Sequence, residues 1–361
     1  MLILFFYSCK LYITNPRVNI FGAMNSQFYS FIIPVYNRPQ EIDDLLLSIS
    51  KMYAKNLHFE VLVIEDGSTQ TASKVCEKWA SKIPLVYHFK LNSGPGKSRN
   101  FGMQKANGNH FIILDSDVTL PPHYLKSVDE FLNKHKDIDF WGGADRCNDD
   151  FTDLQKAIDF SMTSFLTTGG IRGRKKSITN FEPRSFNMGI SKEAFEVSNG
   201  FGKIHPGEDP DLSLRLKKKG FKSAFIPNAY VFHKRRIDFV KFQKQIRKFG
   251  LVRPILMKWH PSSKKVSFFL PSLFVLSLSF SFVLFLFQLP ALLMLFLLYF
   301  IILFFQAFYI HRSFKISLLA VATSFIQLFV YGVAFLESYY YFHIQDFHAE
   351  DKFPELFFNR D

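Results

Sequence analysis

Short apolar runs alternate with helix-like stretches through the first part of the chain. The runs have the length and continuity of buried strands, and they lie at 28–35 (FYSFIIPV), 59–66 (FEVLVIED), 85–90 (LVYHFK) and 111–115 (FIILD). Stretches with helical spacing lie between them, at 40–53, 71–82 and 97–107. This alternation predicts an α/β fold, a mostly parallel sheet flanked by helices on both faces. In such sheets ligands bind at the carboxyl ends of the strands.

The pattern changes after residue 265, where three long and almost uncharged stretches follow, at 267–287, 290–310 and 314–336. Each is long enough to cross a bilayer, and only Gln288 and Leu289 separate the first two, which predicts a helical hairpin. Gln327 and Glu337 leave a second interpretation open for the third stretch, an interfacial helix. A buried soluble core is disfavoured because the runs carry so little charge.

The flanking charges predict an orientation. Lys264 and Lys265 precede the first apolar stretch, and basic residues also lie between the second and the third, whereas the tail from Gln345 carries mostly acids. By the positive-inside rule the large domain faces the cytoplasm. We therefore expect a multi-pass protein of the inner (cytoplasmic) membrane. An interfacial third stretch would return the tail to the cytoplasm.

Composition adds a preference for anionic partners. The 361 residues carry a formal net charge of +13, which suits nucleic acid, a phosphorylated substrate or a lipid surface. The three cysteines form no C-x-x-C pair, so neither a disulfide framework nor a zinc site is expected. The N-terminal apolar run LILFFYSC is too short to span a bilayer. We interpret residues 1–23 as an extension outside the native fold, with a short membrane-touching anchor as the alternative.

Asp115-Ser116-Asp117 follows the apolar strand 111–114 directly. Two carboxylates one residue apart can bind a hard divalent cation, which removes their mutual repulsion and can bridge a diphosphate. The alternative is a solvated turn or a helix cap. The position at a strand end favours the metal interpretation.

Three further motifs lie at strand ends or helix starts. Asp66, in the turn Glu65-Asp66-Gly67-Ser68, could accept hydrogen bonds from a base or ribose, or could simply cap a helix. SGPGKSRNFG (93–102) could present backbone N–H groups and cations to phosphate, or could be only a capped helix start. In GEDPDLSLRLKKKG (207–220), a carboxylate could take a proton from an attacking hydroxyl. We favour Asp209 for that role and a helix-dipole role for Asp211.

Six segments in this order resemble family 2 glycosyltransferases. They are FIIPVYNRP, VLVIEDGST, SGPGKSRNFG, FIILDSDV, FNMGISKEAFEVSNGF and GEDPDLSLRLKKKG, and together they resemble the whole GT-A catalytic domain over about 28–250. The resemblance implies a nucleotide-sugar donor, a UDP-sugar above others, and inversion at the anomeric carbon. It also implies that the two aspartates of the D-x-D hold Mg²⁺ or Mn²⁺ on the diphosphate.

The resemblance also implies roles for single residues. The donor-binding positions match Pro34, Tyr36, Asn37, Asp66, Arg99, Asp115, Ser116 and Asp117. Asp209 matches the general base, His233 matches a further metal ligand, and Glu208 and Asn187 are placed on the acceptor side. The chain departs from processive synthases, because FQKQIRKFG (242–250) replaces their Q-x-x-R-W. We therefore expect addition of single sugars rather than polymer extrusion.

These inferences divide the chain into five parts: an extension (1–23), a GT-A domain (24–250), a basic juxtamembrane segment (251–265), a transmembrane region of two to three helices (266–341) and an acidic tail (342–361). The basic clusters suit lipid head groups better than nucleic acid, which we do not expect as a partner. RGRKK (172–176) is assigned to an acceptor loop that meets a lipid-phosphate acceptor. The wider class of acceptor expected is a membrane-associated saccharide or a lipid-linked acceptor.

Three other functions remain open at this point. A polyprenyl-phosphate sugar synthase would use a lipid phosphate as nucleophile and would depend less on Asp209. A non-catalytic membrane scaffold would need no intact acidic motifs, yet Asp66, Asp115, Asp117 and Asp209 are all present. A transporter is disfavoured because the apolar stretches lack paired charges.

Overall fold

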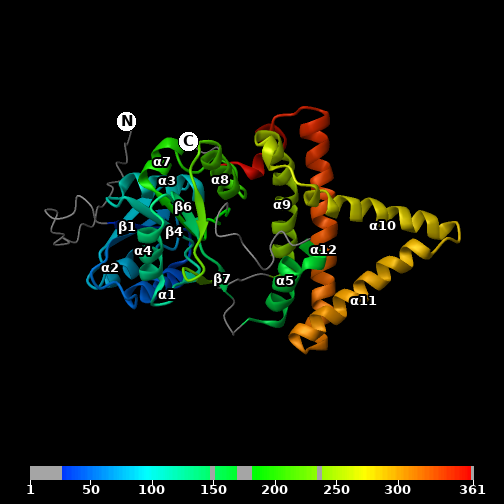
Figure 1. Cartoon of the computed structure of the whole chain (residues 1–361), viewed down its shortest axis with the longest axis horizontal. Helices are drawn as coiled ribbons and strands as arrows, with labels where there is room; N and C mark the ends of the chain where they lie inside the picture. The colour runs from blue at the N-terminus through cyan, green and yellow to red at the C-terminus, as the bar shows by residue number, and fades with distance from the viewer. Residues whose placement is uncertain (1–26, 147–150, 169–180, 234–237, 359–361) are drawn as a thin grey trace, which may run out of the picture. The chain divides into compact units, whose positions relative to one another are not determined.

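The computed structural model describes residues 27–146, 151–168, 181–233 and 238–358 (Figure 1). The chain forms two compact units, each discontinuous in sequence. Unit 1 comprises residues 1–147, 177–234 and 358–361, and unit 2 comprises 148–176 and 235–357. The expected N-terminal extension (1–23) and the basic segment RGRKK (172–176) lie outside the described residues.

Unit 1 contains ten strands and six helices within its described residues. In chain order they are β1 (Phe28–Val35), α1 (Pro39–Ser50), β2 (His58–Asp66), α2 (Ser73–Ala80), β3 (Leu85–Lys90), α3 (Pro95–Lys105), β4 (His110–Leu114), β5 (Val118–Thr119), α4 (Tyr124–Lys134), β6 (Phe140–Gly142), β7 (Asp145–Arg146), β8 (Asn187–Ser191), α7 (Lys192–Ser198), α8 (Glu208–Lys218), β9 (Ser223–Phe225) and β10 (Val231–His233). The four strands and three helices predicted from the apolar pattern are all present, with ends shifted by a few residues.

The main sheet has seven strands in the order β3-β2-β1-β4-β8-β6-β9. The first four strands are parallel to one another, and β6 is parallel to β9. Only β8 runs antiparallel to its neighbours, β4 and β6. The mostly parallel α/β sheet expected from the sequence is therefore confirmed.

Helices cover both faces of this sheet, and β1 shows how its residues divide between them. Phe31 and Ile33 join a core with residues of α1, α2 and α4. Ile32, between them, joins a second core with residues of α3, α7 and α8. All three side chains are fully buried. A strand buried on both faces reads as a near-continuous apolar run, and the hydroxyl of the buried Ser30 within it donates to Glu60 at 2.7 Å.

A second, smaller sheet has the order β5-β10-β7. β10 pairs antiparallel with β5, and the register places His233 opposite Val118. Val118 directly follows Asp117 in the chain. The backbone of His233 therefore lies beside the D-x-D motif.

The contact between β8 and β6 leaves no room for a side chain at Gly189. A Cβ atom built there would lie 1.9 Å from Cε2 of Trp141, a ring that is 1% exposed. We expect Gly189→Ala to lower the free energy of unfolding by about 1–3 kcal/mol, because a packed core accommodates an added methyl only by strain. Thermal unfolding in detergent would measure the effect. Lys192→Ala, at an exposed neighbouring position, is the control, and equal stability of the two variants would contradict the packing argument.

The secondary-structure elements of unit 2, within its described residues, are all helices. Its elements are α5 (Asp153–Thr163), α6 (Phe165–Thr168), α9 (Phe239–Trp259), η1 (Pro261–Ser263), η2 (Val266–Phe268), α10 (Leu270–Leu286), α11 (Ala291–His311), α12 (Phe314–Tyr339), the π-helical turn η3 (Tyr340–Ile344), α13 (Ala349–Lys352) and η4 (Pro354–Leu356).

Helix α12 packs against α5, α9, α10 and α11. The Thr323 hydroxyl donates to the carbonyl oxygen of Ala157 in α5 at 3.1 Å. Arg247 of α9 forms two hydrogen bonds with the carboxylate of Glu337, at 2.7 and 3.2 Å. This pairing explains how an acid is accommodated in an otherwise apolar helix.

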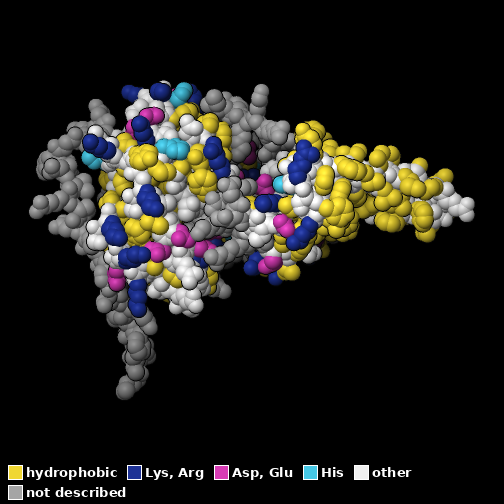
Figure 2. Space-filling model, turned by 90° about the horizontal axis from the view of Figure 1, so that it is seen from below, with side chains coloured by type: hydrophobic (Ala, Val, Ile, Leu, Met, Phe, Trp, Pro, Cys, Tyr) yellow, Lys and Arg dark blue, Asp and Glu magenta, His cyan; other side chains and the backbone are white. Residues whose placement is uncertain are grey.

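Two helices are long and apolar enough to cross a membrane, Ala291–His311 and Phe314–Ile344, while α10 is shorter. The third predicted stretch is thus part of the longest helical run, although its polar residues had left an interfacial alternative open. Side chains of α10 and α11 are widely exposed, among them Leu276 (55%), Leu297 (52%) and Phe305 (63%). Figure 2 shows hydrophobic side chains covering the segment that carries these two helices.

Candidate active site

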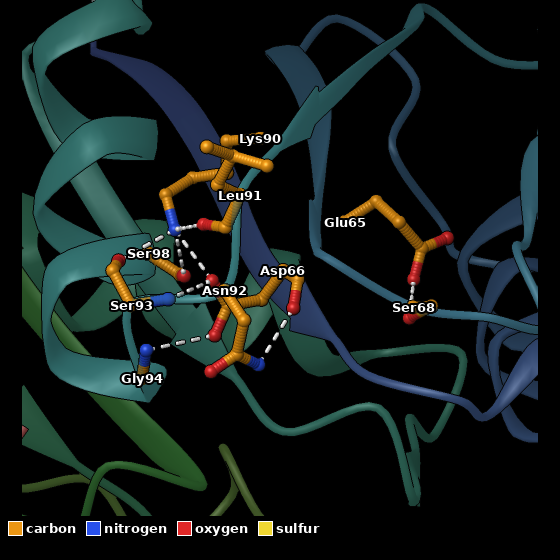
Figure 3. Close-up of polar contacts among 9 residues, drawn as sticks. All are labelled: Glu65, Asp66, Ser68, Lys90, Leu91, Asn92, Ser93, Gly94 and Ser98. Carbon is orange, nitrogen blue, oxygen red and sulfur yellow. Dashed lines mark hydrogen bonds and ion pairs between the residues drawn. The ribbon is translucent and has the colours of Figure 1, made fainter. Parts of the chain in front are cut away.

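Two loops at the carboxyl ends of β1 and β2 are tied together by hydrogen bonds. The Asn37 side-chain oxygen accepts from the backbone N–H groups of Thr69 and Gln70, at 2.9 and 3.0 Å. The Asn37 N–H donates to the Ser68 hydroxyl oxygen at 2.7 Å, and that hydroxyl donates to Glu65, as Figure 3 shows. Glu65 is fully buried and also accepts from the Ala72 N–H at 2.6 Å. These bonds fix the loop that carries the predicted nucleoside-binding residues.

Asp66 holds the glycine-containing loop ahead of α3 (Figure 3). Its carboxylate accepts from the backbone N–H groups of Ser93 and Gly94, both at 2.9 Å, and forms an ion pair with Lys90. Gly94 has φ +90°, a left-handed conformation that favours glycine. Pro95 then begins α3, whose N-terminus points backbone N–H groups outward as anion-binding helix starts do.

Arg99 joins the two acidic motifs. It extends from α3, its side chain is 3% exposed, and its guanidinium donates to Glu208 at 2.9 Å and to Asp115 at 2.8 Å. Glu208 begins α8, and Asp115 follows β4, so two acids more than 90 positions apart in the chain both bind the Arg99 guanidinium. The D-x-D motif (Asp115 to Asp117) and the pair Glu208-Asp209, called the E-D motif from here on, therefore belong to one site.

Glu208 is held as a carboxylate. Burial disfavours its charge, but His205, whose Nδ1 lies 3.0 Å from Glu208, and Arg99 outweigh that cost and lower the pKa of Glu208 to about 2. A group that stays ionised so firmly is suited to orienting a cation rather than to exchanging protons.

Asp209, the next residue, has the opposite tendency. Burial raises the pKa of Asp209 above its usual value, and the neighbouring charge of Glu208 adds to that rise, while Arg184 works against it. The Arg184 guanidinium lies 3.7 Å from the Asp209 carboxylate. Two adjacent carboxylates with displaced pKa values are typical of a site in which one of them handles a proton.

Asp117, the second carboxylate of the D-x-D, has its own arginine. Arg38 donates to Asp117 Oδ2 at 3.0 Å and also lies 3.2 Å from Glu41. Arg38 comes from the loop between β1 and α1, and about half of its side chain is exposed. Each aspartate of the motif is thus partnered by a guanidinium.

A divalent cation would be held by these aspartates together with the donor. Among the described residues, no three His, Cys, Asp or Glu side chains cluster as a metal site. Asp115 and Asp117 provide carboxylate oxygens of the kind that Mg²⁺ and Mn²⁺ prefer, and Mg²⁺ sites commonly combine one or two carboxylates with substrate phosphates. The chemistry of the aspartates therefore fits a cation that binds together with a diphosphate.

The remaining predicted residues lie at various depths. Tyr36 is 52% exposed and Pro34 is half-buried at the end of β1, while Ser116 is buried within the D-x-D. Asn187 is 1% exposed, its side-chain oxygen accepts from the Tyr124 hydroxyl at 2.6 Å, and its nitrogen donates to a backbone carbonyl at 2.8 Å. Both ends of the Asn187 amide are thus bound within unit 1.

Several residues of the site were not singled out from the sequence. They are Arg38, Glu65, Lys90, Arg184 and His205. Each is a single charged or polar residue in a loop or at a strand end, and no spacing rule distinguishes it from a solvated surface residue. Arg38 lies within the FIIPVYNRP motif and His205 lies two residues before GEDPD, and these positions were the available signal.

An aromatic residue from the far end of the sequence also belongs to unit 1. The Phe358 N–H donates to the Lys203 carbonyl at 3.1 Å, and the Phe358 ring centroid lies 5.7 Å from that of His205. A Cβ atom built on Gly94 would meet this ring at 2.4 Å. The Phe358 ring therefore covers the loop of Ser93 and Gly94 that Asp66 binds, and no sequence motif predicted this contact.

Comparisons with known proteins agree with this geometry. Residues 30–198 match the family model described as "Glycosyl transferase family 2". The poly(ribitol-phosphate) beta-N-acetylglucosaminyltransferase TarS of Staphylococcus aureus is 36% identical over 109 residues, which are 30% of this chain and 19% of that protein. An uncharacterized glycosyltransferase of Haemophilus influenzae is 29% identical over 194 residues, 52% of this chain and 61% of that protein. The chain thus covers less than two thirds of these relatives.

A solved structure shares the fold. The mannosyltransferase PcManGT from Pyrobaculum calidifontis, in complex with GDP-Man and Mn²⁺, superimposes with a TM-score of 0.50 at 16% identity, over 67% of this chain and 66% of that one. The sheet is therefore of the GT-A type predicted from the motifs. Residues 30–198 are thus similar to family 2 glycosyltransferases.

Proposed function

We propose that the protein is an inverting, metal-dependent glycosyltransferase. It moves a sugar from a nucleoside-diphosphate sugar, a UDP-sugar above others, to a hydroxyl of a membrane-associated glycan or lipid-linked acceptor. One observation carries this proposal: Arg99 joins Asp115 of the D-x-D to Glu208, the neighbour of Asp209. This contact supports the assignment of donor binding and proton acceptance to one site.

Asp209 acts as the general base in this proposal. It takes the proton of the acceptor hydroxyl, and the resulting oxygen attacks the anomeric carbon from the face opposite the departing diphosphate. One base and one displacement suffice for inversion. A carboxylate whose pKa is raised by burial is a stronger proton acceptor than an ordinary aspartate, which supports this assignment.

Asp115 and Asp117 hold Mg²⁺ or Mn²⁺ in this proposal, with His233 as a further ligand. The register of β10 against β5, which sets the His233 backbone beside Val118, supports that addition. When bound, the cation supplies charge neutralisation for the leaving diphosphate. The solved mannosyltransferase with the same fold carries Mn²⁺ together with its sugar nucleotide.

The donor nucleoside is assigned to the loop of Pro34, Tyr36 and Asn37. The Asn37 side-chain oxygen is bound to the 68–70 turn. We therefore assign this side chain to holding the shape of the donor-binding loop. Asp66 is assigned a similar task, since it holds the Ser93-Gly94 backbone. Asn187 is assigned to the acceptor side. Both ends of its amide are already bound, one of them to the Tyr124 hydroxyl, so we assign it a positioning role there rather than direct contact with the acceptor.

We place the protein in the inner membrane with unit 1 in the cytoplasm. The exposed apolar surfaces of α10 and α11 support this placement, because large exposed apolar patches on folded chains mark contacts with a membrane or another protein. Acceptors assembled on a membrane would suit such a location. TarS, whose name specifies poly(ribitol-phosphate), is one relative with a polymeric acceptor.

A donor screen on the detergent-solubilised full chain tests the proposal. The protein is incubated with a panel of nucleotide sugars and Mn²⁺, with and without a membrane-lipid extract, and nucleoside diphosphate release is followed. We expect release from one donor, dependence on metal, and loss of release in Asp117→Ala. Absence of both release and binding for every donor would favour a non-catalytic scaffold. Activity only with a lipid phosphate as acceptor would favour the polyprenyl-phosphate synthase.

A further inference from the structure

The two arginines that partner the D-x-D motif differ in how firmly they are held. Arg99 is buried, and a second carboxylate, Glu208, fixes its guanidinium from the other side. Arg38 reaches Asp117 from the loop between β1 and α1 with 49% of its side chain exposed. A buried, doubly paired guanidinium is a fixed part of the site, whereas a half-exposed ion pair contributes little stability and separates readily.

Arg38 also has an alternative partner close by. Its guanidinium lies 3.2 Å from the carboxylate of Glu41, three residues along the chain in the first turn of α1. Arg38 can therefore leave Asp117 without losing every negative neighbour. Only a change of side-chain rotamer is required, because the loop itself is held by Asn37.

A divalent cation and a guanidinium repel each other when they share one carboxylate oxygen. A diphosphate offers the guanidinium a better partner, because the planar fork of arginine matches phosphate oxygens in pairs. The Asp117 carboxylate can thus bind two groups in succession, first the Arg38 guanidinium and then the divalent cation.

We propose that Arg38 exchanges between Asp117 and the donor diphosphate, a step that rests on the proposed function and adds a donor-positioning residue to it. In the absence of donor, Arg38 neutralises Asp117 and weakens cation binding. When cation and donor bind together, the cation takes Asp117 and Arg38 moves to the diphosphate. The exchange makes binding of the cation and of the donor mutually dependent.

The test uses Mn²⁺ and inorganic pyrophosphate with the full chain in detergent micelles. Free Mn²⁺ is measured by electron paramagnetic resonance, and pyrophosphate binding in saturating Mn²⁺ by calorimetry. Arg38→Ala should bind Mn²⁺ alone about two- to fivefold more tightly than wild type, because the competing ion pair is gone. The same variant should bind pyrophosphate at least tenfold more weakly. Lys126→Ala, which removes an exposed positive charge paired with Glu130, should change neither.

Arg38→Lys keeps the charge and guards against a folding defect in the alanine variant. It should return Mn²⁺ affinity towards the wild-type value while pyrophosphate binding stays weak, because a lysine lacks the fork. Unchanged Mn²⁺ affinity in Arg38→Ala, or unchanged pyrophosphate affinity, overturns the exchange. Failure of wild type to bind Mn²⁺ even with pyrophosphate overturns instead the metal centre of the proposed function.

Discussion

Asp209→Asn is expected to lower the rate of sugar transfer by about 10²–10⁴-fold while leaving donor binding intact, because the amide cannot accept the acceptor's proton. The isosteric change keeps the backbone and the packing around Arg184. Transfer to the acceptor found in the donor screen would be compared with donor affinity measured by calorimetry. Loss of both together would indicate a structural rather than a chemical role.

The pH dependence of the wild type follows from the same residue. A base works only when ionised, so transfer should rise with pH and level off above the pKa of Asp209. Because burial raises that pKa, the rise should be centred above the range of an ordinary aspartate. A profile of transfer rate against pH from pH 4 to pH 8 would show this rise. In Asp209→Asn the rate should no longer fall at acidic pH.

Asp211→Asn provides the matched control. Asp211 lies in the same first turn of α8, is also buried and is paired with Arg215 at 2.9 Å. We expect this variant to lose some stability but to keep the wild-type pH profile. A polyprenyl-phosphate synthase would show a small effect in both variants, since its nucleophile is already ionised.

Arg99→Met is expected to lower the free energy of unfolding by about 3–5 kcal/mol and to abolish transfer. Methionine fills similar space but leaves Glu208, which is 3% exposed, without the guanidinium that helps to hold its pKa low. Asp115 loses its partner at the same time. Thermal unfolding and donor release, measured on the same preparation, report the two effects separately.

A double-mutant cycle separates the coupling energy between Arg99 and Glu208 from the cost of a general disruption of the core. Glu208→Gln removes the buried charge, so Arg99→Met should cost less in that background than in the wild type. Additive costs would mean that the Arg99–Glu208 contact, at 2.9 Å, contributes little coupling. Arg99→Lys, which keeps the charge but lacks the fork that reaches both acids, should recover stability better than activity.

The sequence predicted the part of the fold that follows from periodicity. Continuous apolar runs such as 28–35 are required by strands buried on both faces, and β1, β2, β3 and β4 lie where those runs lie. The antiparallel β8 and the short strands β5 and β7 gave no comparable signal, whereas β10 ends the strand-like run FIPNAYVFH (225–233). A strand of two or three residues is too short to show a period, and its pairing depends on distant partners.

Candidate site residues could be proposed from the sequence where a motif contained both chemistry and position. Asp115, Asp209 and Arg99 were proposed in this way, and the structure joins the D-x-D and E-D motifs through Arg99. Residues whose role arises only from long-range contact were missed. Arg38 lies 79 positions from Asp117, and Phe358 reaches Gly94 from outside every motif.

The discontinuity of the two units has a consequence for how the chain is made. Helix α5 leaves the ribosome well before α9 to α12, yet its buried residues Ala157 and Phe160 pack with Leu303 and Ala320 of α11 and α12. Until those helices are synthesised, this apolar face has no partner within unit 2. Nascent chains that stall before residue 303 should therefore depend on a chaperone or an insertase that shields α5, and their aggregation should ease once α12 emerges.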